Sequence, residues 1–74
     1  MKALDLQGLA CPLPVLRTNK YLKDMAPGET LRLLVSDAAA PEDFRKYCES
    51  TGHALIEISE QSGVYAIVLR KRQD

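Results

Sequence analysis

Apolar and polar residues alternate near the start of the chain, and this alternation predicts a short β-strand. Leu4 and Leu6 are separated and flanked by small or polar residues. A period of two is typical of a strand with one buried face, and Gly8 then allows the backbone to turn. We therefore predict a first strand at residues 3–7, followed by a loop.

The next segment, residues 12–25, has the spacing of an amphipathic helix. Its apolar side carries Val15 and Leu22 and extends to Ala26. The opposite side carries polar residues: Arg17, Lys20 and Asp24. The Pro-Gly pair at 27–28 is expected to end the helix.

Residues 30–36 are almost continuously apolar, as in a central strand that is covered on one side by helices. A second helix is predicted at residues 41–51, because a proline and two acidic residues precede an apolar stripe at helical spacing. Gly52 is expected to end this helix. The stripe consists of Phe44, Tyr47, Cys48 and Thr51.

The last third of the chain predicts a β-hairpin. Residues 54–58 alternate, with Ala54, Ile56 and Ile58 on one face, and residues 64–69 form an apolar run. The turn residues at 61–63 separate the two strands. Residues 70–74 are mostly charged and are expected to form a solvated tail.

The resulting order is β-α-β-α-β-β, which we assign to a single α/β domain over residues 1–74. Two crossovers and one hairpin make the first three strands mutually parallel and the fourth antiparallel, with both helices on one face. The predicted fold is a two-layer sandwich with a mixed four-stranded sheet. The order of the strands within the sheet does not follow from the pattern.

Composition narrows the classes of function. The 74 residues contain ten Lys and Arg and ten Asp and Glu, so the formal net charge is zero. Domains that bind nucleic acid through phosphates usually carry a basic excess, so stable binding to nucleic acid by this chain alone is disfavoured. No apolar run approaches the roughly 20 residues of a membrane span, and the first residues lack the apolar core of a signal peptide. We therefore expect a cytoplasmic protein with no membrane contact and with both cysteines reduced.

The main candidate for chemistry is Cys11, which lies where the first strand gives way to the first helix. Pro12 favours extended geometry at Cys11 and fits the first helical position, so Cys11 is a candidate N-cap. Pro12 and Pro14 lack N–H groups, which leaves the Leu13 amide as the main donor near the sulfur. A thiolate there would gain a hydrogen bond and the positive end of the helix dipole, and such cysteines have pKa values below the ordinary value of about 8.5. Pro14 disfavours helical geometry at Leu13, so the helix has an alternative start at Pro14.

Few other residues are expected to reach this cysteine. The carboxyl ends of parallel strands share one edge of a sheet, so Asp37 is a candidate neighbour of Cys11, although it also fits a cap of the second helix. His53 opens the third strand and should lie at the opposite edge, roughly 20 Å away, which excludes a Cys-His hydrolase. Cys48 is predicted to be a buried apolar residue. The sequence has no cluster with metal-ligand spacing.

A docking surface is predicted beside the cysteine. Leu13, Arg17 and Lys20 recur at helical spacing opposite the buried side, so they should be exposed together. Leu9 in the preceding loop extends the apolar end of this stripe. An exposed leucine next to basic residues is typical of a surface that anchors a partner, with Arg17 and Lys20 steering either an acidic surface or an RNA phosphate. The alternative is an ordinary solvated helix face.

The sequence resembles the TusA/SirA-like family of small sulfur carriers over nearly the whole chain. The resemblance rests on Asp5, Gly8, Cys11, Pro12 and Pro14, then on Asp37, and on Gly52 with His53. It implies the same β-α-β-α-β-β sandwich and a persulfide carried on Cys11, and it implies no metal or organic cofactor. The implied partners are a cysteine desulfurase or a rhodanese-like donor and a downstream sulfur acceptor. Ala38 departs from the proline or second acid of many relatives, which leaves the branch of the family open.

The leading hypothesis is therefore a monomeric sulfur carrier that receives sulfur on Cys11 and relays it. It would be a sulfurtransferase-type carrier, and whether it turns over as an enzyme by itself stays open. The acceptor pathway, whether tRNA thiolation, molybdenum cofactor synthesis or sulfur oxidation, also stays open. Two alternatives are a regulatory or nucleic-acid-binding module without sulfur chemistry, and a thiol redox sensor with Cys48 as the second thiol.

Overall fold

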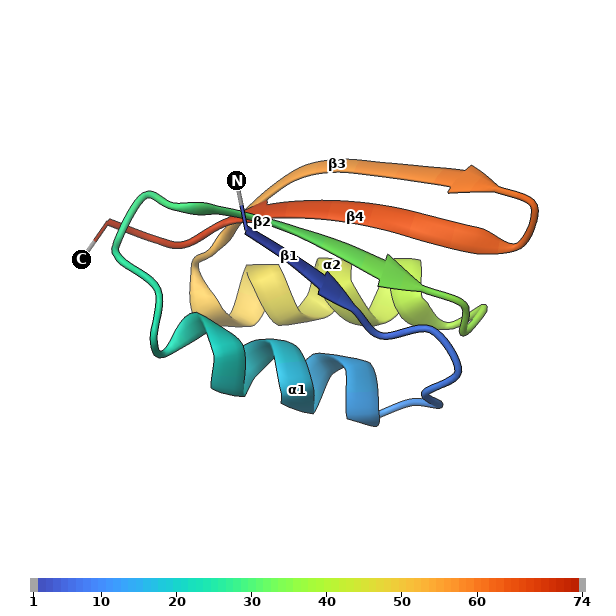
Figure 1. The fold of residues 1–74 in the computed structure, drawn as a ribbon. Helices are drawn as coiled ribbons and strands as arrows, with labels where there is room; N and C mark the ends of the chain where they lie inside the picture. The colour runs from blue at the N-terminus through green and yellow to red at the C-terminus, as the bar shows by residue number, and fades with distance from the viewer. Residues whose placement is uncertain (1, 74) are drawn as a thin grey trace.

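The computed structural model describes residues 2–73 as a four-stranded sheet with two helices packed on one face (Figure 1). The predicted two-layer α/β fold and its element order are confirmed. The strands are β1 at Lys2–Asp5, β2 at Thr30–Val35, β3 at Ala54–Gln61 and β4 at Val64–Arg70. The helices are α1 at Leu13–Leu22 and α2 at Ala40–Thr51.

The order of strands in the sheet is β1-β2-β4-β3. β1 pairs with β2 in parallel, whereas β4 is antiparallel to both β2 and β3. The central strands are β2 and β4. Alternate residues of these strands face the helices and have no exposed surface, which accounts for their apolar sequences. β1 is short and lies at one edge, so its end and the loop that follows it stay accessible.

The core lies between the central strands and α2. Leu31, Leu33, Ile67 and Leu69 have no exposed surface, and neither does Phe44 on α2. Burying an aliphatic or aromatic side chain of this size contributes roughly 1.5–3 kcal/mol, so this layer supplies most of the force that holds the helices on the sheet.

The first helix is shorter than predicted. It begins at Leu13 and ends at Leu22, because the N–H groups of Asp24 and Met25 bond to carbonyls three residues back and tighten the chain into turns. Met25 is buried in the core from this turn segment, and Ala26 is exposed. The prediction that the helix reaches residue 25 with Ala26 on its apolar side is therefore wrong.

The edge strand β3 also departs from the predicted alternation. A bulge between Leu55 and Glu57 inserts one extra residue, so Ile56 is 51% exposed while Leu55 and Ile58 pack against the core. The strand continues to Gln61, three residues beyond the predicted end. The turn is made by Ser62 and Gly63, both with positive φ, which matches the twist of a two-residue hairpin.

Within residues 2–73, neither helix has the length and apolar character needed to cross a bilayer.

Candidate functional site

The loop that carries Cys11 is fixed to the end of β2. The N–H of Leu6 bonds to the Leu34 carbonyl, and the N–H of Gly8 donates to Ser36 Oγ at 2.9 Å. Gly8 has a φ of 84°, a left-handed geometry that other residues rarely adopt, so this glycine allows the loop to turn back over β2. These contacts hold the cysteine loop against the segment that leads into α2.

Asp37 completes this connection. Its Oδ2 accepts a 2.6 Å hydrogen bond from the Cys11 N–H, and its Oδ1 accepts one from the Ala39 N–H at the start of α2. These two backbone donors hold the pKa of the Asp37 carboxyl below its ordinary value, with Ala39 contributing more. Asp37 therefore has both of the positions considered from the sequence, beside Cys11 and at the entry to the second helix.

The start of α1 differs from the prediction at Cys11. Pro12, which follows a cis peptide bond, is the N-cap residue, so the prediction of Cys11 as N-cap is wrong. The Leu13 N–H donates to the Ala10 carbonyl at 2.9 Å. The prediction that this amide serves the sulfur is also wrong, because its hydrogen bond is already made within the loop. The other predicted start, Pro14, lies inside the helix and is buried.

The Cys11 thiol is exposed, and its environment is acidic. A hydrogen bond to the Asp43 carboxylate is the largest cause that raises the pKa of the Cys11 thiol, and the negative charges of Asp43 and Asp37 act in the same direction. The prediction of a lowered pKa is therefore wrong. Two carboxylates near the sulfur outweigh the positive end of the helix, which is equivalent to only about half a charge.

Asp43 is the residue that the sequence analysis missed as a neighbour of the sulfur. It comes from the first turn of α2, where an acid also stabilises the helix terminus. The predicted topology already places the first turns of both helices at the sheet edge where β1 and β2 end. An acidic residue in the first turn of the second helix could therefore have been predicted to lie near Cys11.

Cys11 opens onto a groove of about 350 Å³ between the two helices. The α2 side of the groove comes from residues at helical spacing on one face, and the other side comes from the start of α1. Figure 1 shows the two helices side by side beneath the sheet, with the loop after β1 leading into α1. The lining residues are Cys11, Pro12, Val15, Asp43, Lys46, Tyr47 and Ser50.

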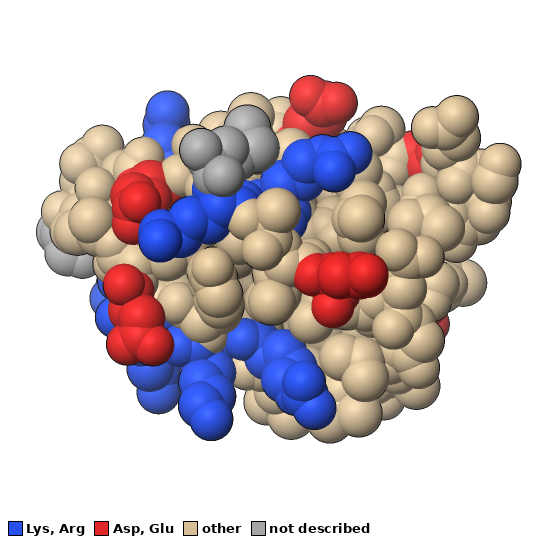
Figure 2. Space-filling view, viewed as in Figure 1, with Lys and Arg blue, Asp and Glu red and all other residues tan. Residues whose placement is uncertain are grey.

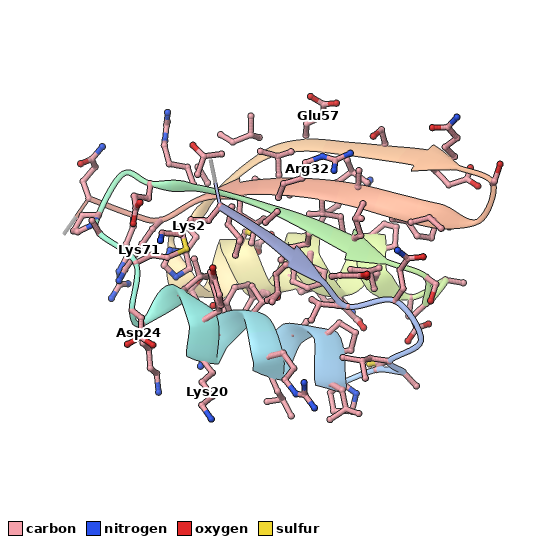
Figure 3. All side chains as sticks on the ribbon, in the orientation of Figure 1. Lys2, Lys20, Asp24, Arg32, Glu57 and Lys71 are labelled. Carbon is pink, nitrogen blue, oxygen red and sulfur yellow. The ribbon has the colours of Figure 1, made fainter. Side chains whose placement is uncertain are left out.

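The residues of the predicted docking stripe lie on the surface of α1. Leu13 is 42% exposed, and Arg17 and Lys20 are exposed as well. Figure 3 shows Lys20 pointing away from the sheet. Leu16, which the sequence analysis did not include, is 57% exposed beside them. Leu9 is only partly exposed and packs against the core, so it offers less surface than predicted.

The remaining candidates lie away from the exposed thiol. Cys48 is 5% exposed, and burial raises the pKa of its thiol to about 11, which fits the predicted apolar role. His53 follows the end of α2, where its Nδ1 accepts a hydrogen bond from the Arg72 N–H. The structure thus does not bring His53 to Cys11. Among residues 2–73, no three His, Cys, Asp or Glu side chains are grouped to hold a metal ion.

Comparison with known proteins places this site in a family. The family model described as Sulfurtransferase TusA matches residues 2–71. The chain belongs to the TusA family.

Relatives in the TusA family match over almost their full length. A Neisseria meningitidis protein, named provisionally as a sulfur carrier, is 45% identical over 96% of both chains. The sulfur carrier protein TusA of Pseudomonas paraeruginosa is 38% identical over 96% of this chain and 90% of its own. The crystal structure of a SirA-like protein from Desulfitobacterium hafniense has a TM-score of 0.85 at 27% identity, covering 97% of this chain and 99% of that one.

Proposed function

We propose that this protein carries sulfur as a persulfide on Cys11, which it receives from a donor protein and passes to an acceptor. The observation that carries the proposal is an exposed thiol at the mouth of the groove, in a chain of the TusA family. A protein that relays sulfur must expose its sulfur atom to two successive partners. Cys11 meets this requirement, and Cys48 does not.

The proposed transfer is a thiol-persulfide exchange. The Cys11 sulfur attacks the terminal sulfur of a donor persulfide, an S–S bond forms to Cys11, and the donor's own S–S bond breaks. The donor cysteine leaves as a thiolate and takes up the proton that Cys11 lost, so the exchange needs no external oxidant or reductant. Delivery to the acceptor is the same reaction with Cys11 as the leaving thiolate.

The acidic residues near the sulfur imply that the donor protein has to help convert the Cys11 thiol into the reactive thiolate. Because Asp43 and Asp37 raise the pKa of Cys11, the thiol form is favoured when the protein is alone. A donor that places a positive group near these carboxylates would lower that pKa and increase the thiolate fraction. The same carboxylates make Cys11 a poorer leaving group in the free protein, so its persulfide reacts more slowly with small thiols in solution.

The donors that fit this chemistry are a cysteine desulfurase or a rhodanese-like protein. Both present sulfur as a cysteine persulfide, which needs no metal or organic cofactor on the receiving side. The acceptor is a thiol or an enzyme in tRNA thiolation or another sulfur pathway. We place the protein in the cytoplasm as a monomeric carrier of this kind.

We assign the donor's docking surface to the α1 stripe formed by Leu13, Leu16, Arg17 and Lys20. Leu13 and Leu16 expose apolar surface within the first turn after Cys11. The two basic residues continue the stripe along the helix, so an acidic donor surface would be held with its persulfide near Cys11.

Two variants test this surface. Leu13→Ser and Arg17→Glu are expected to slow sulfur transfer from the donor without changing the melting temperature or the alkylation of Cys11 by a small reagent. Arg45→Glu, an equal charge change at an exposed position of α2, is the control and should transfer at the wild-type rate. Unchanged rates in both test variants would shift the docking surface to the loop at residues 37–41.

The carrier function is tested by mass spectrometry. The purified chain is incubated with a cysteine desulfurase and free cysteine, and we expect one added sulfur atom on Cys11 that a reductant removes. Cys11→Ser should take up none, whereas Cys48→Ser should behave as wild type. No adduct, or an adduct on Cys48 alone, would contradict the proposal.

A further inference from the structure

A second and larger pocket lies at the opposite end of the helix pair from Cys11. It has a volume of about 620 Å³ and is bounded by the end of α1, the end of α2 and the segment after β4. Figure 2 shows Lys and Arg side chains gathered over this half of the molecule, with acidic groups among them. The residues lining the pocket are Asn19, Leu22, Lys23, Ser50, Thr51, His53, Lys71 and Arg72.

Two of its cations are held in place by the ends of the helices. Lys71 Nζ donates to the Met25 carbonyl at 2.6 Å, just after α1, and Arg72 Nη1 donates to the Thr51 carbonyl at 2.7 Å, in the last turn of α2. An ammonium and a guanidinium each have more than one N–H donor. Each side chain is therefore fixed by one bond and retains donors for a ligand.

The net charge of the pocket is positive. Lys23, Lys71 and Arg72 contribute three full charges, and the two helix C-termini are each equivalent to about half a negative charge, which leaves about +2. None of the lining residues is a carboxylate. Figure 3 shows Asp24 at the same end of the molecule as Lys71, but Asp24 does not line the pocket.

Neutral groups in the pocket can also donate hydrogen bonds. Asn19 Oδ1 accepts the Tyr47 hydroxyl, which identifies the other atom of that amide as an NH₂ group. His53 Nδ1 accepts the Arg72 N–H, so the neutral ring carries its proton on Nε2. The pocket thus combines positive charge with neutral donors on separate elements.

We propose that this pocket binds the phosphate group of a small phosphorylated ligand. A phosphate dianion matches a net charge of about +2, and its several oxygens match donors that come from different directions, whereas one carboxylate would use only part of them. The volume lies in the range of small-molecule sites and leaves room for a sugar-sized group beside the phosphate. A long RNA is a poorer fit, because the chain as a whole has no basic excess.

The test uses the full chain in low-salt buffer with ADP as the probe. We expect saturable binding in calorimetry, and NMR shifts centred on the amides of Asn19, Thr51, His53 and Arg72. Acetate at the same concentration should cause much smaller shifts. Shifts spread over every basic residue, or equal shifts with acetate, would overturn the proposal. A single-stranded RNA that binds here while ADP does not would also overturn it.

Matched charge variants locate the binding. Lys23→Gln removes a pocket cation whose side chain makes no hydrogen bond within residues 2–73, and we expect it to weaken ADP binding by at least about threefold. Arg45→Gln removes one charge from an exposed site on α2 and should leave binding unchanged. Adding Arg72→Gln to Lys23→Gln should raise the loss to at least about tenfold. Equal effects of Lys23→Gln and Arg45→Gln would reduce the binding to general charge attraction.

Discussion

The two ends of the helix pair differ in charge and in chemistry. Both helices begin at the end that holds Cys11, where Asp37 and Asp43 surround the thiol. Both helices end near Lys71 and Arg72. The Lys71 side chain donates to the Met25 carbonyl in the turn after α1, and the Arg72 side chain donates to the Thr51 carbonyl in the last turn of α2. Each end thus carries charges opposite to its helix dipoles, acids at the positive end and bases at the negative end.

This comparison shows that a cysteine beside a helix N-terminus need not be acidic. The dipole offers about half a charge, and the acids that complement it bring full charges close to the sulfur. The carboxylates therefore decide the direction of the shift in the pKa of Cys11. At the other end, the bases exceed what the dipoles require, and the excess leaves a positive pocket.

The largest expected contrast is between the thiol at the acidic end and the thiol within α2. Cys11 is exposed, whereas Cys48 is 5% exposed and burial raises the pKa of its thiol to about 11. We expect iodoacetamide to modify Cys11 on the order of 100 times faster than Cys48 in the native protein. Peptide mass spectrometry over time measures both rates. Comparable rates would mean that α2 opens readily, and urea should abolish the difference.

The next contrast separates the two carboxylates near the sulfur. Asp43→Asn removes the largest cause of the raised pKa of Cys11, so that pKa should fall and alkylation near neutral pH should become several-fold faster. Asp37→Asn should have a smaller effect, because Asp37 acts on the thiol only through its charge. The pH dependence of the alkylation rate gives the pKa of Cys11 in each of the two variants. A larger decrease with Asp37→Asn would reverse the assignment of the dominant carboxylate.

A smaller effect, on the free energy of unfolding, is expected at the hydrogen bond that joins the two helices between the Cys11 groove and the positive pocket. The Tyr47 hydroxyl donates to Asn19 Oδ1 at 2.9 Å, and the two residues line the groove and the positive pocket respectively. Tyr47→Phe should lower the free energy of unfolding by about 1 kcal/mol, because the hydrogen bond between the helices is lost. Urea titration measures this loss. Tyr21→Phe is the control and should change the free energy of unfolding little. An equal loss in Tyr21→Phe would show that the hydrogen bond of Tyr47 does not stabilise the fold specifically.

The smallest effect concerns pH at the positive end. Burial, followed by the charges of Arg72 and Lys71, lowers the pKa of His53 below its ordinary value. The folded protein then binds this proton less readily than the unfolded chain. The stabilisation is complete above the unfolded pKa of about 6.5 and is lost as the pH falls through the folded value.

We therefore expect the unfolding free energy to decrease as the pH falls below about 6.5, and to decrease less in His53→Gln. Urea titrations at a series of pH values check this difference. Asp37, with its lowered pKa, would lose its contribution only as the pH falls below its unfolded value of about 3.9 and through its lower folded value, so its loss begins at a more acidic pH than that of His53. Identical pH profiles for the wild type and His53→Gln would show that neither burial nor the charges of Arg72 and Lys71 lower the pKa of His53.

The sequence by itself determined which segments become strands and helices, and that Cys11 follows the first strand. Those features depend on local periodicity and on local backbone preferences, as at Gly52, whose left-handed φ ends α2. The shared edge of Cys11 and Asp37 also followed from the sequence, because crossover connections impose parallel strands. The position of His53 at the other end had the same origin.

Tertiary structure decided the environment of each of these residues. Asp43 lies near the Cys11 thiol because α1 and α2 pack side by side. No local sequence pattern determines how close these two residues come. The bulge in β3 moved Ile56 to the surface, because pairing with β4 sets the register of that strand. The sequence predicted a solvated tail for Lys71 and Arg72, yet Lys71 donates to a carbonyl in the turn after α1 and Arg72 donates to a carbonyl in the last turn of α2. Long-range packing brings such groups together, and their charges act through space rather than along the chain.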